Sequence, residues 1–518
     1  MTRAADPNPG PGARRSSRLA DTLLAVASVV VGIVVAEGVV RHLNGQPLFV
    51  FPLAEAVGTT SVDVEQVNRI PLAEGVDRKW FYSDPLPLPN RREPPEGWMK
   101  LFDYYKDHPS SHSEFQPIDN FKVWNSAFVG DPCAHRFLRL APGKLYVYDP
   151  PDGSKSPPYR FYPNVTLPDR LVTNQIGWRG RLIEVPRRDK TVRIVFVGAS
   201  TTVDGHNLPF SYPEFVGHWL NVWAKSKGLD VRFEVLNAGR ESVVSTDIAE
   251  VVHSEVLPLR PDLVVYYEGA NEFRPASIVD KVPPGSPARP AGAQATTSPA
   301  WLRTLSRYSA LMGRIQAAIG FAASDMEGGE WPKPDYRVVW PPGLDEQDPD
   351  LAYANLPVNL NTIQRSLDQI RSELASAGNG ELALSSFLWT VRDGLVLDPI
   401  RHKYIIEQLN IANYPFHYRE LERLAKFQNR VFAKYAAAHG LTFVDFARYM
   451  PFDPDLFTDA IHLNYAGVRL QGWIALQQLL PTIDKHLKDG SWPAPLKPDL
   501  PLPTFTSRQI SFTCPKGA

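Results

Sequence analysis

The amino-acid sequence predicts an α/β protein, a three-layer α/β/α sandwich with a five-stranded parallel sheet. Five largely apolar runs alternate with segments of helical periodicity. Continuous apolar runs are typical of strands buried on both faces, and alternation with helices favours a parallel sheet covered on either side. The predicted strands cover 192–199, 232–239, 262–271, 381–390 and 441–447.

Helices are expected between these strands. The segments 212–228 and 246–259 follow the first and second strands, and a last helix is expected over about 464–487. Two further helices each place apolar side chains on one face. These side chains are Ile363, Leu367, Ile370 and Leu374 in one helix, and Leu424, Phe427, Val431 and Tyr435 in the other.

The α/β domain is expected over residues 190–487, with other regions before and after it. Two inserts, at about 275–350 and 391–415, interrupt it and are expected to form lids, since loops of this length are usually functional or disordered. The remaining regions are an N-terminus (1–18), an apolar helix (19–42), a small β-rich or irregular region rich in proline (43–185) and a C-terminal tail (488–518).

Composition excludes several function classes. Among the 518 residues, 43% are hydrophobic and 21% charged, as in a globular protein, and the net charge of −1 with no basic stripe argues against nucleic-acid binding. The 12 histidines form no HExxH-type pair and no phosphate-binding glycine loop is visible, so neither a metal nor a cofactor is expected. The two cysteines, Cys133 and Cys514, are either free thiols or one bridge between the tail and the N-terminal region.

The N-terminus predicts a membrane anchor. Leu19–Val40 is an apolar segment of 22 residues, interrupted only by Asp21 and Glu37, and a spanning helix needs about 20. Arginines before it should stay cytoplasmic, which leaves the body of the protein outside, in the periplasm or at the cell surface. A cleaved signal peptide, with Thr22–Ala36 as its core, and a buried helix are the alternatives. The arginines are Arg3, Arg14, Arg15 and Arg18.

Residues that could form an active site follow four of the predicted strands. Ser200 lies in "GASTT" after the first strand, Gly239 and Asn271 end the second and third, and "TDAIHLNYAG" after the fifth contains Asp459 and His462. In open parallel sheets, ligands bind at the carboxyl ends of the strands. We therefore expect all five residues to meet at one edge of the sheet.

These residue types are the parts needed for acyl transfer. A serine hydroxyl needs a base to become a nucleophile, and His462 can serve because an imidazole titrates near neutral pH. Asp459 can orient the imidazole and stabilise its charged form. The backbone N–H groups of Ser200 and Gly239 and the amide of Asn271 can form an oxyanion hole.

The four blocks "GAST", "NAG", "GANE" and "DAIH" resemble those of the SGNH (GDSL-like) hydrolase superfamily, in particular membrane-anchored bacterial members. The resemblance covers about 190–487. It implies a flavodoxin-like sheet, Ser200 as nucleophile, Asp459 and His462 as its partners, and an oxyanion hole with Gly239 and Asn271. Two departures are alanine where "GDS" has aspartate and Glu272 where "GxND" has aspartate.

The expected function is that of a serine esterase, an acyl hydrolase acting on an extracytoplasmic O-acyl ester, such as an O-acetyl group, of a glycan or lipid. An O-acyltransferase that modifies cell-envelope polysaccharide would use the same acyl-enzyme. A non-catalytic envelope scaffold is the alternative from another class.

The first insert leaves the third strand directly after Asn271, so it is expected to form a helical flap over the serine. Its apolar contacts should include Trp301, Leu302, Tyr308 and Leu311. Arg274, Arg392 and His417 either reach the pocket and bind a polar substrate or lie on the solvated surface.

Overall fold

The computed structural model of the chain separates into two compact units. One comprises Met1–Glu55 and Ala288–Pro332, and the other Ala56–Pro287 and Lys333–Ala518. The structure describes residues 11–43, 48, 62, 64–88, 147–149, 156–157, 160–161, 163–164, 166, 171–205, 208–280, 305, 309–318, 329–331, 333–378, 380–398, 401–495, 501–503 and 506–508. Cys133 and Cys514 lie outside these residues.

The larger unit contains the predicted five-stranded parallel sheet. Its order, β3-β2-β4-β5-β6, places the second strand of this sheet at one edge and the first beside it, as in flavodoxin-like sheets. All four neighbouring pairs are parallel. The strands are β2 (Thr191–Gly198), β3 (Arg232–Asn237), β4 (Leu263–Tyr267), β5 (Glu381–Ser385) and β6 (Thr442–Val444).

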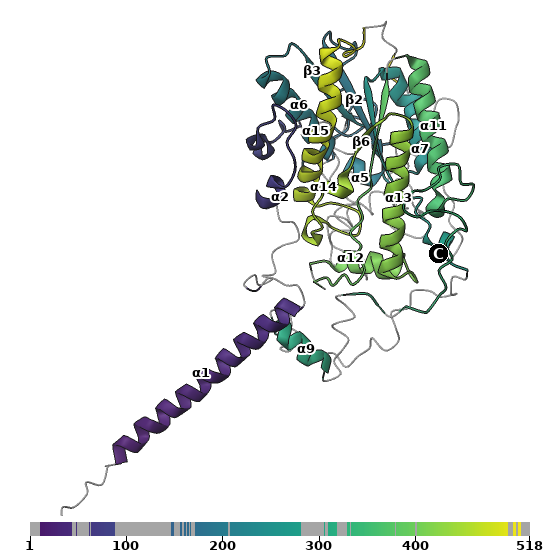
Figure 1. Cartoon of the computed structure of the whole chain (residues 1–518). Helices are drawn as coiled ribbons and strands as arrows, with labels where there is room; N and C mark the ends of the chain where they lie inside the picture. Colours follow the sequence, from purple (N-terminus) through teal and green to yellow (C-terminus); the bar gives the residue numbers. More distant parts are fainter. Residues whose placement is uncertain are drawn as a thin grey trace, which may run out of the picture. The chain divides into compact units, whose positions relative to one another are not determined.

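Helices cover both faces of this sheet, as predicted (Figure 1). One face carries α6 (Tyr212–Ser226) packed on α15 (Tyr465–Lys488), and the other carries α7 (Ser245–Val251), α11 (Leu360–Ala377) and α13 (Tyr418–Ala438). The helix predicted over 246–259 is regular only to Val251 and continues as a π turn and a 3₁₀ turn. Pro258, which has no N–H to donate, lies in the last of these turns.

Part of the N-terminal region belongs to the core of this unit. The 3₁₀ turn η1 (Arg78–Tyr82) places Phe81 against tryptophan side chains of α6 and α15. The Phe81 ring lies 6.2 Å from Trp219 and 5.6 Å from Trp473, centroid to centroid. The short helix α2 (Val64–Asn68) precedes this turn. The predicted irregular region is therefore packed on the α/β domain at this point.

The tail also contributes a strand. β1 (Val147–Asp149) and β7 (Thr506–Arg508) form an antiparallel pair, separate from the main sheet. Val147 lies opposite Arg508 in this pair.

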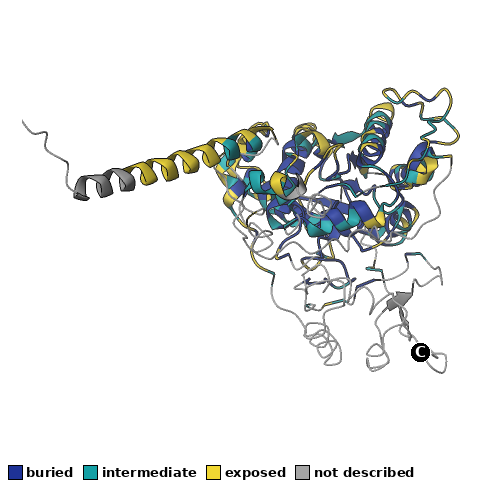
Figure 2. Ribbon diagram, turned by 90° about the horizontal axis from the view of Figure 1, so that it is seen from below, coloured by how far each residue is buried: buried dark blue, intermediate teal, exposed yellow. Residues whose placement is uncertain are grey.

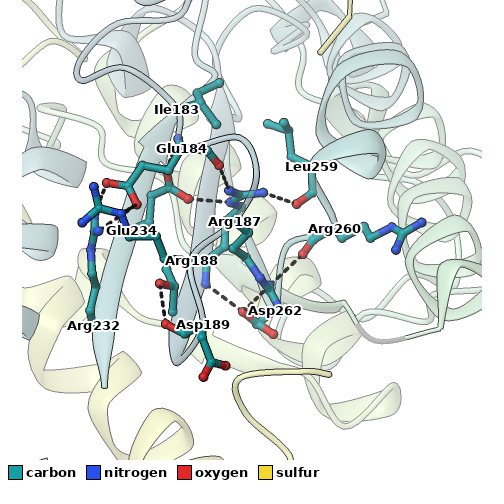
Figure 3. Close-up of polar contacts among 12 residues, drawn as sticks. Ile183, Glu184, Arg187, Arg188, Asp189, Arg232, Glu234, Leu259, Arg260 and Asp262 are labelled. Carbon is teal, nitrogen blue, oxygen red and sulfur yellow. Dashed lines mark hydrogen bonds and ion pairs between the residues drawn. The ribbon is translucent and has the colours of Figure 1, made fainter. Parts of the chain in front are cut away.

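A network of buried charges closes the amino-terminal edge of the main sheet (Figure 3). The Asp262 carboxylate, just before β4, accepts the N–H of Arg193 at 2.7 Å and that of Ala494 at 2.8 Å. Arg187 adds an ion pair at 3.1 Å. Arg193 itself binds Glu234 of β3 at 2.6 Å. Because Asp262 is fully buried, its hydrogen bonds link β2, β4 and the segment after α15 without competition from water.

Replacing Asp262 tests this network. Asp262→Ala leaves Arg187 buried without its carboxylate and should lower the free energy of unfolding by about 3–5 kcal/mol. The measurement is urea unfolding of the detergent-solubilised chain, followed by tryptophan fluorescence. Asp230→Ala is the matched control, because Asp230 pairs with Lys190 at the surface with 83% of its side chain exposed. Equal unfolding midpoints for the two variants would contradict the proposed contribution of Asp262 to the free energy of unfolding.

The smaller unit contains, among its described residues, the helices α1 (Pro11–Leu43) and α9 (Ala310–Ala318). Within α1, Ala20–Leu43 is apolar enough to cross a membrane, with a mean hydropathy of 2.6, and it is the one such helix among the residues that the structure describes. Most residues of this apolar stretch are exposed, as the ribbon colours of Figure 2 show. The Glu37 carboxylate binds the N–H groups of Ala310 and Leu311, both at 2.9 Å, at the start of α9.

Candidate active site

Ser200 begins the single-turn helix α5 (Ser200–Val203), directly after β2. The start of α5 can pack closely against the end of β4 because Gly198 has no side chain. A Cβ at this position would overlap the Tyr267 carbonyl oxygen and the Thr202 side chain. Thr202 Oγ1 then donates to the Tyr267 carbonyl at 3.0 Å, which ties the turn to the end of β4. Ser200 is thereby held at the carboxyl edge of the sheet.

The structure brings Ser200, His462 and Asp459 together. Ser200 Oγ lies 2.7 Å from His462 Nε2, and His462 Nδ1 lies 2.7 Å from Asp459 Oδ2. A carboxylate accepts but does not donate, so Nδ1 carries the hydrogen and Nε2 is left to accept the serine proton. The imidazole is therefore placed to act as a general base toward Ser200.

Several contacts keep Asp459 ionised. Its Oδ1 accepts the N–H groups of Ile461 at 2.9 Å and His462 at 2.8 Å. Burial raises the pKa of Asp459, but His462 and these backbone donors outweigh it and lower the pKa to about 2. The carboxylate can thus orient the imidazole across the working range of pH.

Asp459 and His462 lie in a tight turn before α15. Phe457 and Leu463 form a β-bridge at its base, and the Thr458 N–H donates to the His462 carbonyl at 2.8 Å. Asn464 caps α15 by accepting the Gly467 N–H at 3.1 Å. Because Asn464 does the capping, the Asp459 carboxylate is not used to start the helix and is directed to His462 instead.

Gly239 lies against the back of the Ser200 turn. A Cβ at this position would come within 2.6 Å of Val203 N and 3.0 Å of Thr202 C. Its N–H donates to Asn237 Oδ1 at 3.0 Å, while Asn237 Nδ2 donates to the Thr202 carbonyl at 2.7 Å. Gly239 therefore permits the close approach of β3 to this turn. Its contribution of an N–H to an oxyanion hole stays a prediction, since that N–H is engaged with Asn237.

Two hydrogen bonds hold Asn271 in place. Its Nδ2 donates to the Val243 carbonyl at 2.7 Å, and its N–H donates to Glu268 at 2.7 Å. An amide nitrogen carries two hydrogens, so one bond to Val243 still allows a second toward an oxyanion. Glu268 also accepts the Ala270 N–H at 2.8 Å, which turns the chain here and ends β4 at Tyr267 rather than at the predicted 271. Burial raises the pKa of Glu268 to about 7.

Two further residues support these loops. Glu272, in the "GANE" block, accepts the Ser245 N–H at 2.7 Å at the start of α7. Arg179, from the irregular region, binds the carbonyls of Asp204 at 2.5 Å and Leu208 at 2.8 Å after α5. A lone arginine in a loop-rich segment is not distinguishable from surface arginines by spacing, so the sequence could not indicate this role.

The predicted flap stays a prediction. Trp301, Leu302 and Tyr308 lie outside the described residues, and Leu311 is in α9, where its N–H binds Glu37. The three basic residues have other contacts. Arg274 binds the carbonyls of Asn271 and Phe273, Arg392 stacks 4.0 Å from the Phe452 ring, and the His417 N–H donates to Tyr336 Oη at 2.6 Å.

A substitution at Gly239 tests the close approach of β3. Gly239→Ala should displace the Ser200 turn, and a displacement near 1 Å typically lowers activity by about 100-fold. The measurement is kcat/KM for hydrolysis of an aryl acetate. Gly313→Ala, where a Cβ meets no atom within 4 Å, is the control and should leave the rate unchanged. A Gly239→Ala variant with full activity would show that the turn tolerates a side chain there.

No family model and no curated protein matches the chain. Solved structures do match it. The match to a lipase/acylhydrolase from Enterococcus faecalis has 16% identity and a TM-score of 0.30, and covers 56% of this chain and 96% of that one. An acetyl xylan esterase, AlAXEase, matches with 13% identity, coverage of 55% and 98%, and a TM-score of 0.29. A protein from Parabacteroides merdae described as a GDSL-like lipase matches with 14% identity, coverage of 56% and 95%, and a TM-score of 0.30.

By their names, these similar structures are GDSL-like lipases, acylhydrolases and acetyl xylan esterases, the class that the four sequence blocks resemble. TM-scores of 0.29–0.30 support no inference about activity or substrate. The proposed chemistry of this site is therefore inferred from its own side chains.

Proposed function

We propose that the protein is a serine esterase that hydrolyses an O-acyl ester outside the cytoplasm. The observation that supports this most directly is the continuous hydrogen-bonded series from Ser200 Oγ to His462 and on to Asp459, with both distances at 2.7 Å. In a scaffold protein without catalysis, nothing would require an ionised carboxylate, an imidazole and a hydroxyl in this order.

The proposed reaction has two halves. His462 removes the proton of Ser200 as Oγ attacks the ester carbonyl, and the imidazolium is stabilised by Asp459. Backbone N–H groups at the Ser200 turn and the side-chain amide of Asn271 stabilise the oxyanion. The alcohol then leaves with the proton from His462, and an acyl-serine remains. Water repeats the sequence with His462 as base, which releases the acid and restores the serine.

Aromatic side chains favour a short acyl group such as acetyl. Phe273, two residues after Asn271, has its ring centroid 4.5 Å from that of Trp389. The residue after Trp389, Thr390, donates its N–H to the Ala460 carbonyl, beside Asp459. The Phe273–Trp389 ring pair is thus close in sequence to both the Asn271 loop and the contact with the Asp459 turn, and we infer that it limits the length of the acyl chain.

Labelling of the serine tests the proposal. A fluorophosphonate probe should label the wild-type chain, and Ser200→Ala should abolish both labelling and hydrolysis, with p-nitrophenyl acetate cleaved faster than longer acyl esters. Ser226→Ala, an exposed serine that bonds only within α6, is the control. Labelling that survives in Ser200→Ala would identify a different nucleophile, and an unlabelled wild type would favour the scaffold.

We also propose that α1 is retained as an anchor rather than cleaved as a signal peptide. Glu37 and Arg41, near its end, form an ion pair at 2.6 Å, and Glu37 binds Ser309 Oγ at 2.7 Å in addition to the start of α9. The end of α1 is thus part of a packed unit, which a cleaved signal peptide does not need.

Retention predicts an intact chain in the membrane. After carbonate extraction, the C-terminally tagged protein should remain in the membrane fraction with its first 36 residues attached. External protease should digest the α/β domain in spheroplasts. Soluble protein that begins at Glu37 would instead establish a cleaved signal.

A further inference from the structure

The segment after β5, residues 386–412, forms hydrogen bonds with the turn that contains Asp459 and His462. Ala460 lies between these residues, and both of its backbone groups bind the segment. Its N–H donates to Gln408 Oε1 at 2.8 Å, and its carbonyl accepts the Thr390 N–H at 2.8 Å. Gln408 begins the π-helical turn Gln408–Ala412, which continues α12 (Lys403–Glu407). The tip of the turn is therefore fixed by residues far from it in sequence.

The same segment also holds the stretch that leads into this turn. Arg401 Nη1 binds both oxygens of Asp455, at 2.8 and 3.0 Å, and His402 Nε2 lies 2.7 Å from the same carboxylate. The Asp398 N–H donates to His402 Nδ1 at 3.1 Å, so His402 Nε2 carries the hydrogen given to Asp455. Asn464, on the far side of the turn, donates to the Asp455 carbonyl at 2.6 Å.

The turn has little regular structure of its own to fix it. Between β6, which ends at Val444, and α15, which starts at Tyr465, the described elements are the four-residue helix α14 (Phe446–Tyr449) and the 3₁₀ turn η9 (Pro454–Leu456). The bond between His462 Nε2 and Ser200 Oγ nevertheless requires the imidazole to be placed closely. Two contacts from the segment after β5 reach the backbone of Ala460, between the two residues that must act together, and of these the Gln408 contact is the one made by a side chain.

We propose that Gln408 is a positioning residue for the reaction: its side-chain oxygen holds Ala460, and through it the Asp459 carboxylate and the His462 imidazole, in register with Ser200. The proposal rests on the esterase function proposed above. It assigns the second insert a role as a support of the active site, distinct from the lid that its position in sequence suggests.

Variants of Gln408 in the detergent-solubilised full chain test this role. Gln408→Asn places the acceptor one methylene too short to reach the Ala460 N–H, and should lower kcat for p-nitrophenyl acetate by about 10- to 100-fold with KM unchanged. The rate of fluorophosphonate labelling should fall in parallel, since it reports the activation of Ser200. Gln408→Glu keeps an acceptor oxygen in reach and should restore most of kcat.

The matched control is Gln478, a half-buried glutamine of α15 whose Oε1 accepts the Asp445 N–H at 2.8 Å. Gln478→Asn should leave kcat and the labelling rate unchanged. A Gln408→Asn variant with wild-type kcat, or equal losses in the Gln408 and Gln478 variants, would overturn the positioning role. Absence of labelling and hydrolysis in the wild-type chain would overturn the esterase function itself, which is a different result.

Discussion

The site depends on one hydrogen bond between residues 262 positions apart in sequence, from Ser200 Oγ to His462 Nε2. A bond of 2.7 Å requires that the end of β2 and the turn before α15 lie at the same edge of the sheet. Parallel strands meet this requirement because all their carboxyl ends point the same way. At the opposite edge, buried ion pairs around Asp262 hold the strands together. The carboxyl edge instead carries the reactive side chains.

Much of this arrangement could be predicted from the sequence, because its signals are local. The apolar strand that ends in "GASTT" predicted both β2 and the place of Ser200, and the helical spacing of Ile363 and Leu367 predicted α11. The position of Asp459 and His462 at the sheet edge was predicted from their spacing of three residues and from the strand that precedes them. Here the local pattern and the fold point to the same answer, as is typical of sequences that specify one structure.

Other features could not be predicted, because they depend on partners that are distant in sequence. The need for glycine at 239 comes from the backbone of Val203, and its N–H donates to the Asn237 side chain, two contacts that no local pattern indicates. β4 ends early because of the Glu268 side chain, which no strand pattern reveals. Arg179 and Phe81 were placed in a region without a clear role, and the structure packs both on the α/β domain.

The pairing of β1 with β7 limits how far the C-terminus can be shortened before the protein self-associates. β7 is the only partner of β1 among the strands that the structure describes, and it lies within the last 13 residues of the sequence. A C-terminal truncation before Thr506 would leave the backbone N–H and C=O groups of Val147–Asp149 without a neighbour. Unpaired strand edges recruit other chains, so the trimmed protein would tend to self-associate even though every residue of the candidate active site is retained.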